Sequence, residues 1–166
     1  MRYNIIATGS GGNCALATFS DEKKVMFDFG KGCFKKCTDE GLVLNSVDQI
    51  LISHAHDDHI GDVHIVPHLL EKRANLEIFN FSLTHNVENQ GFLVVNIRTG
   101  EAFYYLTDFY DIPDDSLATI TDTLQHLYKK NYKIMFIMEL SYCQHLYEKL
   151  DDVHKFGLQH HLSDVG

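Results

Sequence analysis

The sequence predicts a single α/β domain in which helices cover a β-sheet core. Short strand-like runs open the chain, helical segments separate and follow the later strands, and no repeat or low-complexity linker divides the 166 residues. A chain of this length buries roughly 70% of the surface that its unfolded form exposes. One domain over residues 1–166 is therefore expected.

The first half of the chain has the pattern of a β-meander. Strands are expected at 3–7, 15–19 and 25–29, separated by a Gly/Ser/Asn turn and a polar turn. After a loop rich in glycine, lysine and cysteine, a fourth strand is expected at 49–53 with the sequence Gln-Ile-Leu-Ile-Ser.

The second half alternates helical and strand patterns. A helix is expected over 61–73, with a kink at Pro67, and strands at 76–79, 92–97 and 102–106. Pro113 starts a helix, a buried strand follows at 134–140, and two short helical patterns close the chain. The apolar face of the helix after Pro113 is formed by Leu117, Ile120, Leu124, Leu127 and Tyr128.

Charge limits the partners that the chain can bind. Its formal net charge is −9, and Lys31, Lys35 and Lys36 form the main local cluster of positive charge. A long polyanion would be repelled unless bound metal ions and this cluster compensate, so a small anionic substrate suits the charge better.

The N-terminus and the cysteines indicate a cytoplasmic protein. Residues 1–6 lack the apolar core of a signal peptide, and no stretch is long enough to span a membrane. The four cysteines (Cys14, Cys33, Cys37 and Cys143) are expected as reduced thiols, and the Cys33-x3-Cys37 pair is a weak zinc signal.

The segment His54-Ala55-His56-Asp57-Asp58-His59 directly follows the fourth strand. In a tight loop, alternate residues project together, so His54 and His56 can share one metal ion while Asp58 and His59 turn toward a second. Imidazole and carboxylate groups suit zinc, manganese or iron. Chance clustering on a solvated loop is the alternative, and three histidines within six residues interleaved with aspartates argue against it.

Two further positions carry signals of their own. Asp108 ends an apolar strand, where an unpaired carboxylate is costly unless a cation neutralises it. In the turn before the second strand, the amides beside Ser10 and Asn13 either approach a substrate phosphate or pack beneath the site. His64 and His68 are i, i+4 neighbours, but Pro67 lies between them and they are expected on the surface.

These motifs resemble the metallo-β-lactamase superfamily, whose H-x-H-x-D-H loop the segment 54–59 matches. Within it, the segments 8–13, 27–30, 82–85 and 106–109 and the terminal His161-Leu162-Ser163 resemble the YycJ/WalJ-type phosphodiesterase/exonuclease group. The resemblance implies an αββα sandwich with two divalent metal ions, zinc being favoured over manganese or iron, at one edge of the sheets.

The resemblance also implies roles for individual residues. His54, His56 and His85 would hold the first ion, while Asp58, His59 and His161 would hold the second, and Asp108 would bridge both. Asp28 would orient ligands from behind the loop; from the residues alone, an ordinary turn aspartate is an equal alternative. His160 competes with His161 for its role.

The predicted activity is a hydrolysis in which the two ions share a hydroxide that Asp58 orients. A phosphodiesterase or nuclease acting on nucleic acid or nucleotides is favoured. The alternatives are a cyclic-nucleotide phosphodiesterase of the kind phages use against nucleotide-signalling defence, an ester or thioester hydrolase, and a metal-binding protein without turnover.

The chain is shorter than is usual in the resembled group. Only 25 residues separate His59 from His85, and elements that shape substrate access are missing there. The natural substrate is therefore left open. A homodimer is expected, because a partner can complete the substrate pocket of a short chain.

Overall fold

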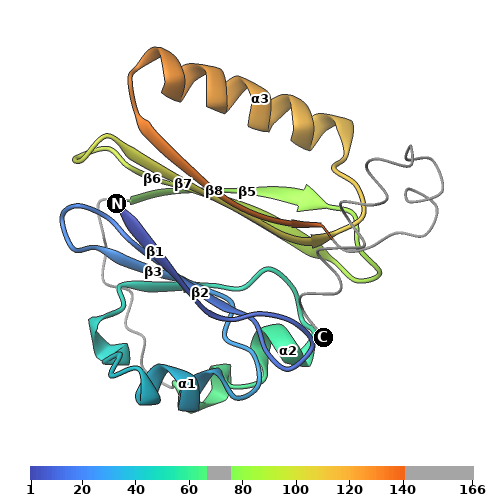
Figure 1. Ribbon diagram of the computed structural model, residues 1–166. Helices are drawn as coiled ribbons and strands as arrows, with labels where there is room; N and C mark the ends of the chain where they lie inside the picture. Colours follow the sequence, from blue (N-terminus) through green and yellow to red (C-terminus); the bar gives the residue numbers. More distant parts are fainter. Residues whose placement is uncertain (67–75, 141–166) are drawn as a thin grey trace, which may run out of the picture.

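The computed structural model describes residues 1–66 and 76–140, without the side chains of 139 and 140. Two four-stranded sheets pack face to face, and helices cover the outer side of each (Figure 1). In chain order the strands form one sheet from β1 to β4 (sheet A) and one from β5 to β8 (sheet B). The predicted αββα layering is confirmed.

Sheet A contains the predicted meander. β1 (Arg2–Ala7), β2 (Cys14–Thr18) and β3 (Lys24–Phe27) are antiparallel, and β4 (Gln49–Leu51) runs parallel to β3. β4 is shorter than the strand expected at 49–53. The backbone N–H of Ser53 donates to the Asp28 carboxylate at 2.8 Å instead of pairing with a strand, which ends the ladder.

Sheet B repeats this arrangement with longer strands. β5 (Leu76–Leu83), β6 (Asn89–Asn96) and β7 (Glu101–Phe109) are antiparallel, and β8 (Lys133–Leu140) runs parallel to β7. The turn between β6 and β7 has Gly100 at a positive φ of 65°. Between the sheets, Phe27 stacks on Phe103 and Tyr105 with ring centroids 5.3 and 4.7 Å apart, which fills the centre of the core.

α3 (Asp114–Lys129) begins at the predicted place and lies on the outer face of sheet B (Figure 1). Its buried residues are Ile120 and Leu127. The predicted apolar face was too wide, since Leu117 is 49% exposed and Tyr128 is 78% exposed. A helix on one side of a sheet buries only the narrow stripe that contacts the strands.

α1 (Cys33–Asp39) covers sheet A and was not predicted. Cys33 and Cys37, four residues apart, both face the core and are buried there with Cys14. These three cysteines are free thiols, as expected. Within the described residues they are not part of a cluster with metal-ligand spacing, so the weak zinc signal gains no support.

The prediction of a helix over 61–73 is wrong for residues 61–66, the part that the structure describes. The chain forms α2 (Asp57–Ile60) and the 3-10 helix η2 (Val63–Ile65), while another 3-10 helix, η1 (Leu44–Ser46), precedes β4. The Asp62 carboxylate accepts from the backbone N–H of Phe34 at 2.9 Å, and the Asp62 N–H donates to Phe29. These bonds tie the segment to sheet A and break the helical run.

None of the helices in the described ranges has the length and apolar content that a membrane crossing requires.

Candidate metal centre

Two loops and the end of strand β7, all at one end of the sandwich, carry the predicted site. The segment 52–60, called here the histidine loop, follows β4 and includes α2. His85 lies in the β5–β6 turn, and Asp108 lies near the end of β7 with a positive φ of 56°. The Thr84 N–H donates to Asp111 and the Tyr110 N–H donates to Thr84, so the two loops of sheet B are held together.

The backbone of the histidine loop is fixed by sheet A. The N–H groups of Asn13, Phe29 and Lys31 donate to the carbonyls of residues 58, 59 and 57 at 2.6, 2.8 and 3.2 Å. Gly30 permits this contact, because a Cβ there would lie 1.7 Å from the Asp58 carbonyl oxygen. The glycine of the Asp-Phe-Gly segment therefore positions the loop.

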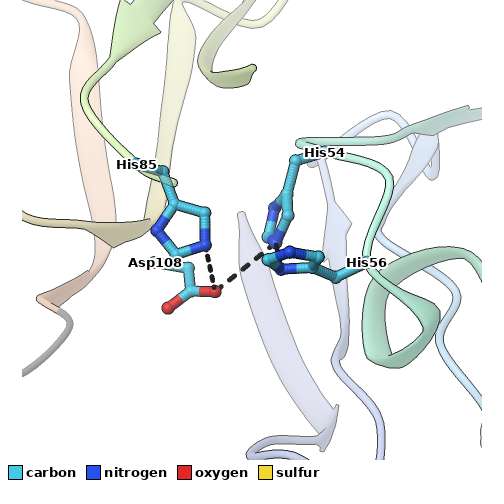
Figure 2. A group of neighbouring side chains, drawn as sticks. All are labelled: His54, His56, His85 and Asp108. Carbon is cyan, nitrogen blue, oxygen red and sulfur yellow. Dashed lines mark hydrogen bonds and ion pairs between the residues drawn. The ribbon is translucent and has the colours of Figure 1, made fainter. Parts of the chain in front are cut away.

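Four side chains converge between the two sheets. His54 and His56 come from the histidine loop, and His85 and Asp108 come from sheet B (Figure 2). Each offers a ligand atom, and these atoms all lie within 4.8 Å of one another. Two of these atoms, His54 Nε2 and His56 Nδ1, lie 3.0 Å apart.

One oxygen of Asp108 lies at the centre of the histidines. Its Oδ2 is 3.4 Å from His54 Nε2, 3.5 Å from His85 Nε2 and 3.7 Å from His59 Nε2. Figure 2 marks the first two of these contacts. The oxygen thus faces both the His54–His56–His85 group and His59, which is the place required of a bridging ligand.

Asp28 lies behind the histidine loop and is fully buried. Its Oδ2 accepts from His59 Nδ1 at 2.9 Å and from the Tyr105 hydroxyl at 2.8 Å. Ser53 donates to Asp28 through its N–H and its hydroxyl. The Ser53 oxygen lies 3.0 Å from His54 Nδ1, so one carboxylate orients two imidazole rings.

These bonds assign the tautomers of both rings. A carboxylate only accepts, so His59 Nδ1 carries the proton and Nε2 keeps its lone pair. The Ser53 hydroxyl gives its hydrogen to Asp28, so it accepts from His54 Nδ1. In both rings Nε2 is left as the acceptor that faces Asp108, which is the form in which histidine binds a metal ion.

Asp58 and His59 form a second group beside the first. Asp58 Oδ2 lies 3.5 Å from His59 Nε2. The side-chain amide of Asn13 donates to both atoms, at 3.0 and 2.9 Å. With Ser10, Thr107 and Asp108 these residues line a cavity of about 200 Å³. The Ser10–Asn13 turn therefore lies beside the cluster.

The environment separates the histidine pKa values. Burial lowers the pKa of His54 to about 4, with His59 adding to the effect. Burial also lowers the pKa of His85. Burial acts in the same sense on His59, but the hydrogen bond and charge of Asp28 outweigh it and raise the pKa of that ring. His54 and His85 are therefore neutral at pH 7 and can act as ligands.

The residues present fit a divalent cation. Both ring nitrogens of His85 are buried and have no hydrogen-bond partner among the described residues, which is costly without a further group. Lone pairs of His54, His85 and Asp108 converge, and nitrogen and oxygen donors of this kind suit zinc, manganese or iron. A bound cation would satisfy all of them.

The structure thus brings together most of the predicted site residues, namely Ser10, Asn13, Asp28, His54, His56, Asp58, His59, His85 and Asp108. His161 lies outside the described residues. Ser53 and Tyr105 were missed, because a serine before a histidine loop and a tyrosine in a buried strand give no signal of their own.

Comparison with known proteins shows the family and the fold. The family described as Anti-Pycsar protein Apyc1 matches residues 7–109. The exodeoxyribonuclease YycJ of Bacillus anthracis is 27% identical over 156 residues, covering 86% of this chain and 55% of that protein. An Anti-Pycsar protein Apyc1 of Bacillus phage vB_BveM-Goe7 is 39% identical over 66 residues, which cover 36% of this chain and 26% of that protein. The chain thus spans about half of the first relative's length.

Solved structures show the same fold. Human tRNase Z, short form, superposes with a TM-score of 0.56 at 15% identity, covering 70% of this chain and 73% of the other. A diphosphatase from the PhnP family gives a TM-score of 0.52 at 15% identity, and the superposition covers 78% of this chain and 74% of the other. Both likenesses confirm the predicted αββα fold.

Proposed function

We propose that this chain, which belongs to the family described as Anti-Pycsar protein Apyc1, is a metal-dependent phosphodiesterase acting on cyclic mononucleotides. The observation that carries the proposal is the convergence of His54, His56, His85 and Asp108 from two sheets onto one point. The family match over residues 7–109 includes all four residues and favours the cyclic-nucleotide alternative over the nuclease.

Two divalent ions, with zinc favoured, are part of the proposal. His54, His56, His85 and Asp108 would hold the first. Asp58, His59 and Asp108 would hold the second, with His161 as a further ligand. This division is supported by Asp108 Oδ2, which faces His54 and His59 at 3.4 and 3.7 Å.

Bound ions would supply a Lewis acid for the phosphoryl oxygens and would lower the pKa of the attacking water. The protein supplies the orientation. Asp58 lies in the cavity with Ser10 and Asn13, where its carboxylate can accept a hydrogen bond from that water. The Asn13 amide fixes this carboxylate by donating to Oδ2 at 3.0 Å.

An exonuclease is the second candidate. The match to the exodeoxyribonuclease extends over 86% of the chain, whereas the match to the Anti-Pycsar protein of Bacillus phage vB_BveM-Goe7 covers 36% of it. A single DNA strand would have to approach a protein with a net charge of −9, which weakens binding unless the lysines near residue 31 contact its phosphates.

The decisive experiment compares substrates at one metal loading. Purified protein is supplied with zinc or manganese and is given four cyclic mononucleotides, single-stranded DNA and bis-p-nitrophenyl phosphate. We expect cyclic nucleotides to be opened and the DNA to be spared. Degradation of DNA without turnover of cyclic nucleotides would establish the second candidate instead.

Asp58→Asn is the matched control for this experiment, because it keeps the shape of the side chain and removes its charge. It is expected to lower turnover of every phosphodiester by about 100-fold. Turnover that is unaffected by this substitution would mean that another group orients the water.

Oligomeric state and compartment complete the proposal. We propose a homodimer that acts in the cytoplasm, where cyclic nucleotides are made. Light scattering of the full chain, with and without metal, measures the oligomeric state; a mass of one chain under both conditions contradicts the dimer.

A further inference from the structure

The face of β5 that points between the sheets changes character along the strand. Leu76 and Ile78 pack against the core between the sheets. Asn80 and Ser82 follow on the same face, because side chains alternate along a strand, and both are exposed. On β6, Gln90 pairs with Ser82, two residues before the core residue Phe92. The inward face is therefore polar only at the end that carries the metal centre.

A cavity of about 480 Å³ lies over this polar end, and we call it the β5–β6 cavity. Sheet B provides Asn80, Ser82 and Gln90, and the β5–β6 turn provides Val87 and Glu88. The histidine loop forms another wall from Ile52 to Ala55, with Ile60 beside it. His54 belongs both to this wall and to the metal centre, so the cavity adjoins the reacting group.

The polar floor of the cavity is fixed in place. The Asn80 amide donates to the Gln90 side chain at 2.9 Å, and the Gln90 amide donates to the Ile52 carbonyl at 3.2 Å. Asn80 and Ser82 both line the cavity and are exposed, so the Asn80 side-chain carbonyl, which these bonds do not use, and the Ser82 hydroxyl can bind a ligand. Val87 and Ile60 add aliphatic surface.

The charge of the cavity excludes a phosphate. No lysine or arginine is among the described residues that line it, and Glu88 contributes a negative charge. A neutral group that carries hydrogen-bond donors and a flat apolar face suits this lining. A nucleobase with its sugar has both properties, and the volume is that of sites for small ligands.

We infer that the β5–β6 cavity binds the nucleoside part of a mononucleotide while its phosphodiester group lies at the metal centre. This inference rests on the proposed function and locates the part of the site that binds the base and the sugar. In a nucleic acid strand, the next phosphate would be brought toward Glu88 and repelled. A cyclic mononucleotide has a single phosphate and avoids this repulsion.

Ser82→Leu tests the inference, because it fills the cavity without touching a predicted metal ligand. We expect the KM for cyclic AMP, GMP, CMP and UMP to rise by about tenfold or more. The kcat/KM for bis-p-nitrophenyl phosphate, which has no nucleoside, should stay within about twofold of wild type. Glu77→Leu, on the opposite face of β5, is the matched control and should change neither value.

Equal losses on both substrates, or an unchanged KM for every nucleotide, would overturn the inference. A wild-type protein that hydrolyses bis-p-nitrophenyl phosphate but no nucleotide would contradict the proposed function. Calorimetric titration of the same cyclic nucleotides into metal-loaded protein then tests, independently of turnover, whether the β5–β6 cavity binds the nucleoside. If wild type binds the nucleotides and Ser82→Leu abolishes this binding, the inference is supported. If wild type does not bind them, the inference is overturned.

Discussion

The two halves of the metal centre are supported in different ways. On the sheet A side, His59 donates to Asp28 at 2.9 Å, and His54 is held through Ser53 at 3.0 Å. On the sheet B side, the ring nitrogens of His85 are buried and neither has a hydrogen-bond partner among the described residues. One half is oriented by the protein, while in the other half a bound cation can satisfy a buried ring nitrogen of His85.

This difference indicates how the centre assembles. The histidine loop is ordered by sheet A without a cation, because its carbonyls and rings are bound from behind. The His85 side gains its stabilisation when a cation binds and joins the two sheets. Metal binding should therefore stabilise the contact between the sheets more than the loop itself.

Asp28→Ala should have the largest effect, because it removes the support of the ordered half. Ser53, His59 and Tyr105 would each lose a buried acceptor. We expect a loss of about 3 to 5 kcal/mol in the unfolding free energy of the metal-free protein, and metal affinity weaker by about 10- to 100-fold. Urea unfolding and competition with a chelator measure the two quantities.

Tyr105→Phe is the control for Asp28→Ala. It removes one donor to Asp28 and should cost only about 1 kcal/mol. If both variants unfolded at the same urea concentration, Asp28 would not be the centre of the network.

His85→Phe should show most clearly that the two halves of the metal centre are stabilised differently. Metal-free protein is expected to keep its unfolding free energy, since the buried nitrogens that have no partner are removed. Wild type should gain about 2.7 kcal/mol when the ion concentration is 100 times its Kd, and the variant should lose most of this gain. If the variant were less stable than wild type without metal but gained the full unfolding free energy when metal binds, the proposed difference between the two halves would be refuted.

Asn89→Leu should have an intermediate effect on the sheet B half. The Asn89 amide donates to the carbonyls of Thr107 and Asp108 at 3.1 and 3.0 Å, where Asp108 has a positive φ. Losing both bonds should cost about 1 to 2 kcal/mol and weaken metal binding by about tenfold. Unchanged affinity for metal would show that Asp108 is positioned by other contacts.

The smallest expected effect is on the pH dependence of stability, and it comes from Glu101, which lies far from the metal centre. Burial raises the pKa of Glu101, but hydrogen bonds from the N-terminal ammonium, Ser20 and Thr99 outweigh it and lower the pKa to about 2. The stabilisation is therefore complete above the ordinary value of 4.5 and is lost as pH falls toward 2. Glu101→Gln should flatten the fall in urea midpoint between pH 5 and pH 3; an equal fall in both proteins contradicts it.

Local patterns allowed much of the fold to be predicted. The β-meander and the start of α3 follow from short-range alternation and from Pro113, and both are confirmed. α1 was missed because its seven residues bury two cysteines rather than a recognisable apolar stripe. The helix over 61–73 was wrong because Asp62 bonds to sheet A, a long-range contact that no local pattern reveals.

The sequence by itself determined the chemistry of the opening motif, His54 to His59, since clustered imidazoles and carboxylates have few uses besides metal binding. It also supplied the resemblance that singled out His85 and Asp108. Only the tertiary structure decided that these two converge with the histidine loop, and that Asp28 orients it through Ser53. The physical reason is that hydrogen bonds across the sandwich depend on distances between residues far apart in the chain, which no periodicity encodes.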